Sequence, residues 1–243
     1  MKDAAALVKN ARYLVALTGA GVSTPSGIPD FRSPRSGLWE NVDPFEVASL
    51  DTLRRRPAAF YQWLQPLVAL MRAAKPNPAH LALAELERRG ILKVLITQNV
   101  DSLHQAAGSQ NVIELHGSFR SATCLKCLRI VSTAELMDQV IATGEVPRCS
   151  CGGVLKPDVV LMGEMLPPQA FHRAEQAARD CDLLLVAGTS LEIAPANNLP
   201  WLALQHGARL VMVNRSPTDL DSRATVLIRD DVATALPAIL EAV

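Results

Sequence analysis

The chain has few aromatic residues, few cysteines, no net charge and no long apolar run. Only 4% of its 243 residues are aromatic, so its core must be mostly aliphatic, which the hydrophobic content of 49% allows. Lysine and arginine number 24, as do aspartate and glutamate, so the basic surface that drives most nucleic-acid binding is missing. No apolar run approaches the roughly 18 residues that span a bilayer. We therefore expect a soluble, cytoplasmic, monomeric protein with neither a nucleic acid nor a membrane as direct partner.

Length and hydrophobic patterning indicate an α/β fold with an addition. A chain of 243 residues exceeds a typical domain of about 150 residues by half, so it suits one large domain carrying an insertion. Short apolar runs, typical of parallel strands buried on both faces, lie at 13–17, 91–96, 183–187, 210–213 and 225–228. Stretches of helical spacing separate them, at 78–89, 167–179, 195–206 and 231–241. This alternation predicts a Rossmann-like, doubly wound parallel sheet.

Two stretches do not fit the alternation. Residues 32–76 have a helical pattern without an obvious strand, and Pro57 is placed to open a helix there. Residues 118–157 hold paired cysteines around a helix-like patch at 133–143. We assign 1–31, 77–117 and 158–243 to the sheet domain, and the two stretches to a helical and a cysteine-containing insertion that form a smaller module.

A glycine-containing loop follows the first expected strand. Residues 19–21, Gly-Ala-Gly, begin it, and such glycines let backbone N–H groups approach a phosphate. The third glycine of the usual dinucleotide-binding spacing is absent, so an ordinary turn is the alternative. Asp30, Phe31 and Arg32 then place an acid, an aromatic ring and a cation side by side, which favours a more specialised site.

Polar residues follow other expected strands. Gln98, Asn99 and Asp101 come after the strand at 91–96, and ligands of open α/β sheets bind beyond the carboxyl ends of strands. Asp101 could instead simply cap a helix at 102–107. His116 comes at a strand end beside a glycine, and a histidine pKa of about 6.5 suits a general base, so His116 is the catalytic candidate among the histidines.

Four of the five cysteines form two close pairs. Cys124 and Cys127 have two residues between them, whereas Cys149 and Cys151 have one. Four thiolates can bind zinc tetrahedrally in a closed, structural site, and the 21 residues between the pairs are close to the usual spacing. Two pairs of reduced cysteines, or a redox couple, are the alternative.

Together these segments resemble the sirtuin family of NAD-dependent protein deacylases. The resemblance covers most of the chain and is carried, in order, by GAGVSTPSGIPDFR (19–32), TQNVDSLHQAAG (97–108), ELHGS (114–118), the cysteine pairs, KPDVVLMGEMLP (156–167) and GTSL (188–191). It implies an NAD-binding Rossmann-like domain with a zinc-binding and a helical insertion. It also implies removal of acyl groups from lysine of acylated proteins or peptides, with NAD as cofactor and Zn²⁺ as structural metal. The products implied are nicotinamide and 2′-O-acyl-ADP-ribose.

The resemblance implies roles for individual residues. His116 matches the general base, while Asn99 and Asp101 match catalytic residues that hold the ribose and nicotinamide. The expected NAD contacts are Gly19, Ala20, Gly21, Ile28, Asp30, Phe31, Arg32, Gln98, Gly188, Thr189, Ser190, Asn214, Asp231 and Val232. The expected substrate contacts, on a segment that pairs with the peptide backbone, are Val160, Met162, Gly163 and Glu164. The implied zinc ligands are Cys124, Cys127, Cys149 and Cys151.

Three positions depart from the family's pattern. Met162 stands where phenylalanine is common, so a softer acyl-lysine channel is expected. Leu64 stands three residues after Tyr61, where sirtuins that prefer succinyl or malonyl chains have an arginine. Because an acidic acyl group then lacks a cationic partner, we predict neutral acyl chains, acetyl first and longer chains next. Asp230 replaces the usual glycine before the adenine contact.

Two other functions stay open. An NAD glycohydrolase or ADP-ribosyltransferase lets water or another side chain take the ribose, and it forms ADP-ribose without an acyl peptide. A non-catalytic NAD-sensing module binds NAD without turning it over. The presence of Asn99, Asp101 and His116, together with the substrate segment, argues against both.

Overall fold

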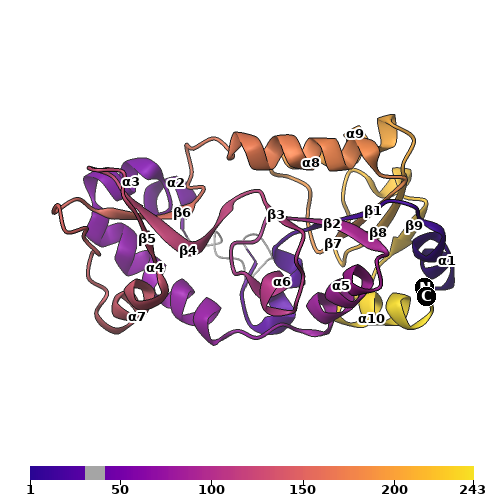
Figure 1. Ribbon diagram of the computed structural model, residues 1–243, viewed down its shortest axis with the longest axis horizontal. Helices are drawn as coiled ribbons and strands as arrows, with labels where there is room; N and C mark the ends of the chain where they lie inside the picture. The colour runs from indigo at the N-terminus through magenta and orange to yellow at the C-terminus, as the bar shows by residue number, and fades with distance from the viewer. Residues whose placement is uncertain (31–41) are drawn as a thin grey trace. The chain divides into compact units, whose positions relative to one another are not determined.

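The computed structural model describes residues 1–30 and 42–243 (Figure 1). The chain divides into two compact units, each assembled from segments far apart in the sequence. The first comprises Met1–Ser26, Lys75–Leu115 and Pro167–Val243, and the second comprises Gly27–Ala74 and His116–Leu166. Among the described residues, no helix combines the length and apolar character needed to cross a bilayer.

The first unit is built on a six-stranded parallel sheet in the order β3-β2-β1-β7-β8-β9. The strands are β1 (Leu14–Thr18), β2 (Leu92–Thr97), β3 (Val112–Glu114), β7 (Leu183–Ala187), β8 (Arg209–Val213) and β9 (Val226–Ile228). The strand order reverses between β1 and β7, which is where open α/β sheets bind ligands beyond the strand ends. The predicted Rossmann-like sheet is confirmed.

Helices cover both faces of this sheet, as Figure 1 shows. One face carries α1 (Lys2–Asn10), α5 (Pro78–Arg88) and α10 (Val232–Glu241), and the other carries α8 (Pro168–Asp180) and α9 (Asn198–Gln205). Leu14 and Ala16 of β1 join the core beneath α1, α5 and α10. Val15 and Leu17, equally buried, point to the opposite face because successive strand residues alternate. Burial on both faces explains why these strands appear as continuous apolar runs.

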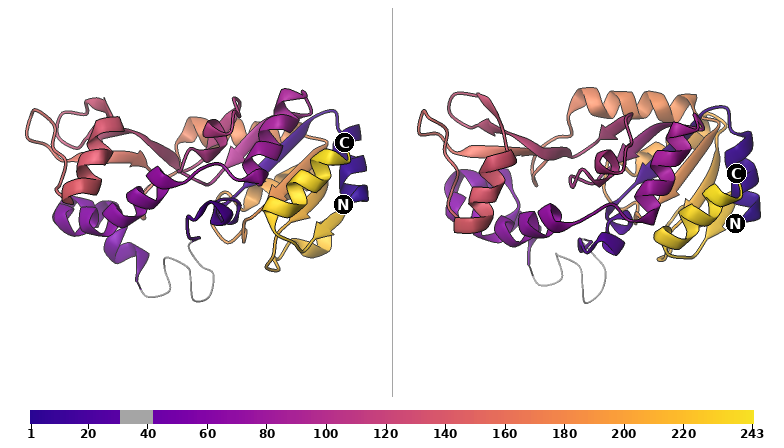
Figure 2. Two further views of the ribbon diagram at one scale, coloured as in Figure 1. Left: turned by 90° about the horizontal axis from the view of Figure 1, so that it is seen from below. Right: turned by 60° about the horizontal axis from the view of Figure 1, so that its bottom comes forward.

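The second unit combines a small antiparallel sheet with helices (Figure 2). The sheet order is β5-β4-β6, with β4 (Gly117–Cys124), β5 (Ile130–Ser132) and β6 (Leu155–Val159). The helices are α2 (Pro44–Val47), α3 (Leu50–Arg55), α4 (Pro57–Ala73) and α7 (Ala134–Thr143). The hydroxyl of Tyr61 in α4 donates to the carbonyl of Leu155 in β6 at 2.5 Å, and the amide of Gln65 donates to the carbonyl of Ile141 in α7 at 2.8 Å. The first bond ties α4 to the small sheet, and the second ties α4 to α7.

Candidate functional site

The loops after β1 and β7 meet where the strand order reverses. The N–H of Gly21 donates to the carbonyl of Gly188 at 2.8 Å. A Cβ on Gly21 would lie 2.9 Å from the backbone of Gly188, and a Cβ on Gly19 would lie 2.7 Å from the Cβ of Thr189. Both distances are shorter than real contacts, so the two loops approach this closely only because glycine stands at these positions. The sheet edge is thereby lined with main chain, as dinucleotide sites require.

A buried serine joins two of the residues expected to be catalytic. Ser23 is 1% exposed and follows the short helix η1 (Ala20–Val22). Its hydroxyl donates to Oδ2 of Asp101 at 2.7 Å and accepts from the amide of Asn99 at 3.1 Å. The same amide donates to the carbonyl of Gly19 at 3.1 Å. Hydrogen bonds therefore fix Asn99 and Asp101 relative to the glycine loop, and Ser23 is a site residue that the sequence analysis missed.

Burial changes the acidity of Asp101. Desolvation raises the pKa of its carboxyl above the ordinary value of 3.8, although the hydrogen bonds from Ser23 and from the N–H of Leu103 oppose that rise. The bond from Leu103, 2.9 Å to Oδ1, comes from the first residue of α6 (Leu103–Ala106). One carboxylate oxygen of Asp101 therefore accepts an N–H at the start of α6, whose N-cap residue is Ser102, and the other accepts from Ser23. A buried carboxyl with a raised pKa gains or loses its proton at a pH closer to neutrality than an exposed carboxyl does.

A second buried network supports the loop after β2. The hydroxyl of Thr18 lies 2.9 Å from that of Thr97 and 3.0 Å from Nε2 of His104. Thr97 also accepts the N–H of Asn99 at 3.1 Å. The rings of His104 and His80 lie 4.8 Å apart, and burial lowers the pKa of His104 to about 3 and that of His80 to about 4. Both rings are neutral near pH 7, so they position the loop and do not serve as acid–base catalysts there.

Further expected NAD contacts lie at the same edge of the sheet. The amide of Gln98 donates to Oγ1 of Thr189 at 3.0 Å, which ties the loop after β2 to the loop after β7. Ser190 follows and is half-buried. Asn214 follows β8, is 8% exposed, and donates to the carbonyl of Ser216 at 2.8 Å. Because all six strands are parallel, their carboxyl ends bring these residues to one edge.

The last expected NAD contacts of the first unit follow β9. Asp231 caps α10, because its Oδ1 accepts the N–H of Ala233 at 2.7 Å, and its Oδ2 is paired with the guanidinium of Arg215. Val232, the first residue of α10, is buried. Asp230, the departure from the family pattern, is exposed, and its carboxylate accepts the N–H of Asp231 at 2.7 Å.

The loop after η1 continues into the second unit. Ala20 lies in η1 and is half-buried. Ile28 and Asp30 belong to the second unit and are half-buried as well. Phe31 and Arg32 lie outside the described residues, so the expectations for them stay predictions.

His116 stands immediately before β4 in the second unit. It is half-buried, and its carbonyl accepts the N–H of Val160 at 2.8 Å. The next residue, Gly117, has a φ of +73°, and a Cβ there would lie 2.1 Å from the carbonyl oxygen of Asp158. Only glycine fits at this crossing of β4 and β6. The His-Gly pair therefore fixes the main chain of His116 beside the expected substrate segment, in which Val160, Met162 and Glu164 are half-buried and Gly163 is exposed.

The four paired cysteines come together in the second unit. Their sulfurs all lie within 4.8 Å of one another, with 3.5 Å between Cys124 and Cys151 and 3.7 Å between Cys127 and Cys149. Zinc–sulfur bonds of about 2.3 Å in tetrahedral geometry put the sulfurs about 3.8 Å apart. Both the donor set and the spacing therefore fit a structural zinc ion, in spite of the short second pair.

Gly153 explains how the short cysteine pair closes. A Cβ on Gly153 would lie 2.6 Å from Sγ of Cys124 and 2.7 Å from Cβ of Lys126. The N–H groups of Cys127 and Lys126 point at Sγ of Cys124, at 3.5 and 3.4 Å. These bonds, that of Cys127 first, lower the pKa of the Cys124 thiol to about 6. They favour the thiolate, which is the form that binds metal.

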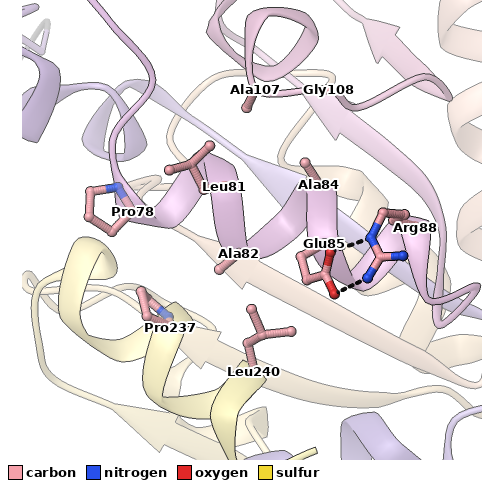
Figure 3. A pocket seen from close by; sticks show the side chains of 10 residues that line it. All are labelled: Pro78, Leu81, Ala82, Ala84, Glu85, Arg88, Ala107, Gly108, Pro237 and Leu240. Atoms are coloured by element: carbon pink, nitrogen blue, oxygen red, sulfur yellow. Dashed lines mark hydrogen bonds and ion pairs between the residues drawn. The ribbon is translucent and has the colours of Figure 1, made fainter.

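A hollow of about 550 Å³ lies against α5 and α10 (Figure 3). It is lined by Pro78, Leu81, Ala82, Ala84, Glu85, Arg88, Ala107, Gly108, Pro237 and Leu240. Its two charged residues pair with each other, because the guanidinium of Arg88 donates two hydrogen bonds to the carboxylate of Glu85. None of the expected site residues lines the hollow, so we do not assign the predicted chemistry to it.

Comparisons with known proteins match nearly the whole chain. A model of the Sir2 family matches residues 19–195. An NAD-dependent protein deacetylase of Geobacillus kaustophilus is 47% identical over 217 residues, which cover 89% of this chain and 87% of that protein. An NAD-dependent protein deacylase of Archaeoglobus fulgidus is 43% identical over 245 residues, which cover 100% of this chain and 96% of that protein.

Solved structures match equally well. A Sir2 variant with a deacetylated p53 peptide and 3′-O-acetyl ADP-ribose has a TM-score of 0.93 and 37% identity, covering 99% of this chain and 97% of that one. A Sir2 protein with a p53 peptide and NAD⁺ has a TM-score of 0.90 and 38% identity, over 99% and 97% of the two chains. Another, bound to a propionylated peptide, has a TM-score of 0.89 and 37% identity, again over 99% and 97%.

Proposed function

Because the chain belongs to the Sir2 family, whose model matches residues 19–195, we propose that it is an NAD-dependent protein lysine deacylase. It transfers the acyl group of an acyl-lysine to the ADP-ribose part of NAD and releases nicotinamide and 2′-O-acyl-ADP-ribose. The observation that carries the proposal is the buried network in which Ser23 joins Asn99 and Asp101 at the carboxyl edge of the sheet. Relatives with this fold bind NAD⁺ and acylated peptides, which supports the same substrates here.

We assign NAD to the edge where β1, β2, β7 and β8 end. The contact between Gly21 and Gly188 supports this assignment, because it leaves the switch point of the sheet free of side chains. Asn214 follows β8, where we expect the adenosine half of NAD, and the bond from Gln98 to Thr189 supports the assignment because it joins the loops after β2 and β7. In this assignment the first unit binds most of the dinucleotide, and the contacts expected of Ile28, Asp30, Phe31 and Arg32 stay predictions from the sequence.

The residues of this chain divide the chemistry between them. NAD, when bound, supplies a ribose whose bond to nicotinamide breaks as the acyl oxygen attacks. Asn99 and Asp101 orient the ribose and nicotinamide, and the Ser23 hydroxyl holds both in place before substrate arrives, which reduces the ordering needed at the barrier. A ring nitrogen of His116 accepts the proton of a ribose hydroxyl, as a general base does. His80 and His104 are buried and neutral, so neither competes for that role.

The cysteine cluster has a structural part in this proposal. Cys124, Cys127, Cys149 and Cys151 would hold Zn²⁺, which would supply only a cross-link between the β4–β5 turn and the turn that precedes β6. Four thiolates leave no open coordination position for a substrate. The division of residues 32–76 and 118–157 into a helical and a zinc-binding insertion, the monomeric state and the cytoplasmic location stay predictions from the sequence.

We propose neutral acyl groups as substrates, with acetyl preferred. Leu64 is 3% exposed in α4, so an apolar side chain occupies the position where an acidic acyl group would need a cation. Tyr61 is fully buried, and its hydroxyl already donates to the carbonyl of Leu155. Neither position therefore offers a charged or available partner for a succinyl or malonyl carboxylate.

A series of acylated peptides tests the proposal. One peptide sequence carries acetyl, propionyl, butyryl or succinyl lysine, and mass spectrometry follows its deacylation with NAD. Acetyl should react fastest and succinyl slowest, and His116→Ala should lower turnover by about two to four orders of magnitude, as expected for loss of a general base. ADP-ribose formed at the same rate without peptide would support a glycohydrolase instead. NAD binding without any turnover would support a sensing module.

A further inference from the structure

The expected substrate segment has little regular structure of its own. β6 ends at Val159, and the next helix, α8, begins at Pro168. A peptide that adds as a strand needs a backbone edge held in an extended shape, because every residue that must be ordered on binding lowers the affinity. The order of residues 160–164 must therefore come from particular bonds to the rest of the second unit.

Two sets of backbone bonds hold one side of this segment. The N–H of Val160 donates to the carbonyl of His116 at 2.8 Å. Met162 donates to the carbonyl of Ala48 at 3.0 Å and accepts the N–H of Leu50 at 3.2 Å, forming an isolated parallel bridge. These bonds anchor residues 160 and 162 but do not extend beyond them.

Gly163 is the residue of the segment whose backbone has the fewest constraints. It is exposed, has a φ of +87°, and has no atom within 4 Å of where a Cβ would be. Within the described part of the chain, no hydrogen bond engages its N–H or carbonyl. The N–H of Glu164 closes a turn around it by donating to the carbonyl of Leu161 at 3.0 Å. Glycine in an exposed turn has more backbone freedom than any other residue, so this turn needs a further constraint.

Lys156, in β6, and Glu164, at the end of the segment, supply that constraint. The ammonium of Lys156 lies 3.0 Å from Oε2 of Glu164, 2.9 Å from the carbonyl of Val159 and 3.2 Å from the carbonyl of Pro157. The same carboxylate oxygen accepts the N–H of Leu161 at 2.9 Å. The two side chains are only 13% and 22% exposed, so this is a partly buried ion pair rather than a surface one.

The chemistry of the pair requires a lysine. An ammonium has three donors, and here it faces three acceptors, two of them main-chain carbonyls of the strand end. A guanidinium is planar and longer, so it suits a carboxylate fork but not this cluster of acceptors around one nitrogen. An uncharged side chain would leave the Glu164 carboxylate half-buried without its cation.

We propose that Lys156 is a positioning residue for the acyl-peptide substrate, which it serves by clamping the turn at Gly163 through Glu164. This inference rests on the proposed function, because it assumes that the peptide backbone pairs with residues 160–164. The clamp orders the peptide-binding edge before the substrate arrives, so its loss weakens peptide binding and leaves NAD binding and the chemical step nearly unchanged.

Steady-state kinetics of Lys156→Met tests the proposal. The KM for an acetyl peptide, at saturating NAD, should rise about tenfold, which corresponds to about 1.4 kcal/mol. The kcat and the KM for NAD should stay within about twofold. Lys93→Met is the matched control, because Lys93 is exposed in the first unit and its ammonium donates to a main-chain carbonyl, that of Gly90. That variant should match the wild type in all three constants.

A modified peptide tests whether the effect passes through backbone pairing. Methylating, one at a time, the backbone nitrogens beside the acyl-lysine removes donors from the added strand and should raise KM with the wild type. With Lys156→Met the same methylation should cost less, because the edge is already disordered. An equal rise in KM on methylation in the wild type and in Lys156→Met would contradict the clamp. A KM of Lys156→Met for the unmethylated peptide within twofold of the wild-type value would also contradict it.

Lys156→Arg keeps the charge and tests the argument if the methionine variant does not fold. It should raise the peptide KM by about threefold or more, and a wild-type KM would refute the requirement for an ammonium. A rise in the KM for NAD equal to that for the peptide would point to a general structural defect and would also refute the proposal. If the wild type itself deacylates no peptide, the proposed function fails; if it does so and these variants behave like it, only the clamp fails.

Discussion

Replacing Ser23 by alanine removes the hydroxyl that joins Asn99 to Asp101. The side chain is 1% exposed, so water does not easily replace it. Two bonds are lost: one at 2.7 Å to a carboxylate and one at 3.1 Å from an amide. A hydrogen bond to a charged group contributes about 1.5–3 kcal/mol and a neutral one about 0.5–1.5 kcal/mol, so the free energy of unfolding should fall by about 2–4.5 kcal/mol.

Urea unfolding at pH 7 measures this loss, and NAD titration at saturating acetyl peptide measures its effect on the site. Because Asn99 and Asp101 lose a common partner, kcat/KM for NAD should fall by about one to two orders of magnitude. Ser26→Ala is the matched control: Ser26 accepts one bond at 2.9 Å from the amide of Asn77, and that amide also donates to Val22. The control should cost about 1 kcal/mol or less. A Ser23 variant as stable and active as this control would refute the role of the network.

Three further predictions follow from burial and spacing. Because the pKa of Asp101 is raised in the folded protein, which favours the protonated carboxyl, the free energy of unfolding of the wild type should decline as the pH rises above about 3.8. Asp101→Asn should abolish this decline, and an unchanged pH profile would contradict the prediction. Because burial lowers the pKa values of His80 and His104, their contribution to the free energy of unfolding should be complete above about pH 6.5 and should fall as the pH falls towards 4, by about 3 kcal/mol for His80. His80→Asn should flatten that fall in acid unfolding curves. Metal analysis should find about one zinc per chain, and Gly153→Ala should lower it, because the added Cβ lies 2.6 Å from Sγ of Cys124; full occupancy in that variant would refute the packing argument.

The large sheet could be predicted from the sequence because parallel strands are buried on both faces. Such strands appear as uninterrupted apolar runs, and residues 183–187 match β7 in full. The small antiparallel sheet could not be predicted in this way. β6 has the sequence Leu-Lys-Pro-Asp-Val, with two charges and a proline, and β5 is largely exposed. The residues of β6 alternate in burial, but its central proline argues against a strand, and β5 is too short and too exposed for a single-sequence prediction to detect.

Site residues that cluster in the sequence could be predicted, whereas those whose partners lie far away in the sequence could not. Asn99, Asp101 and the cysteines stood out because polar groups and thiols cluster within a few positions of the sequence. Ser23 did not, although its position inside the GAGVST run was the available signal, because its partner Asp101 lies 78 positions away. The Lys156–Glu164 pair was equally hidden, since charged residues at that spacing are common on surfaces and only the fold makes them partly buried.

The stoichiometry of products tests the central claim most directly. The purified protein is incubated with NAD and an acetyl peptide, and nicotinamide, free-lysine peptide and O-acetyl-ADP-ribose are quantified by mass spectrometry over time. The account predicts equal amounts of the three products, all dependent on the peptide and all nearly lost in the His116→Ala variant. Nicotinamide released in excess of deacetylated peptide, or at the same rate without any peptide, would contradict it.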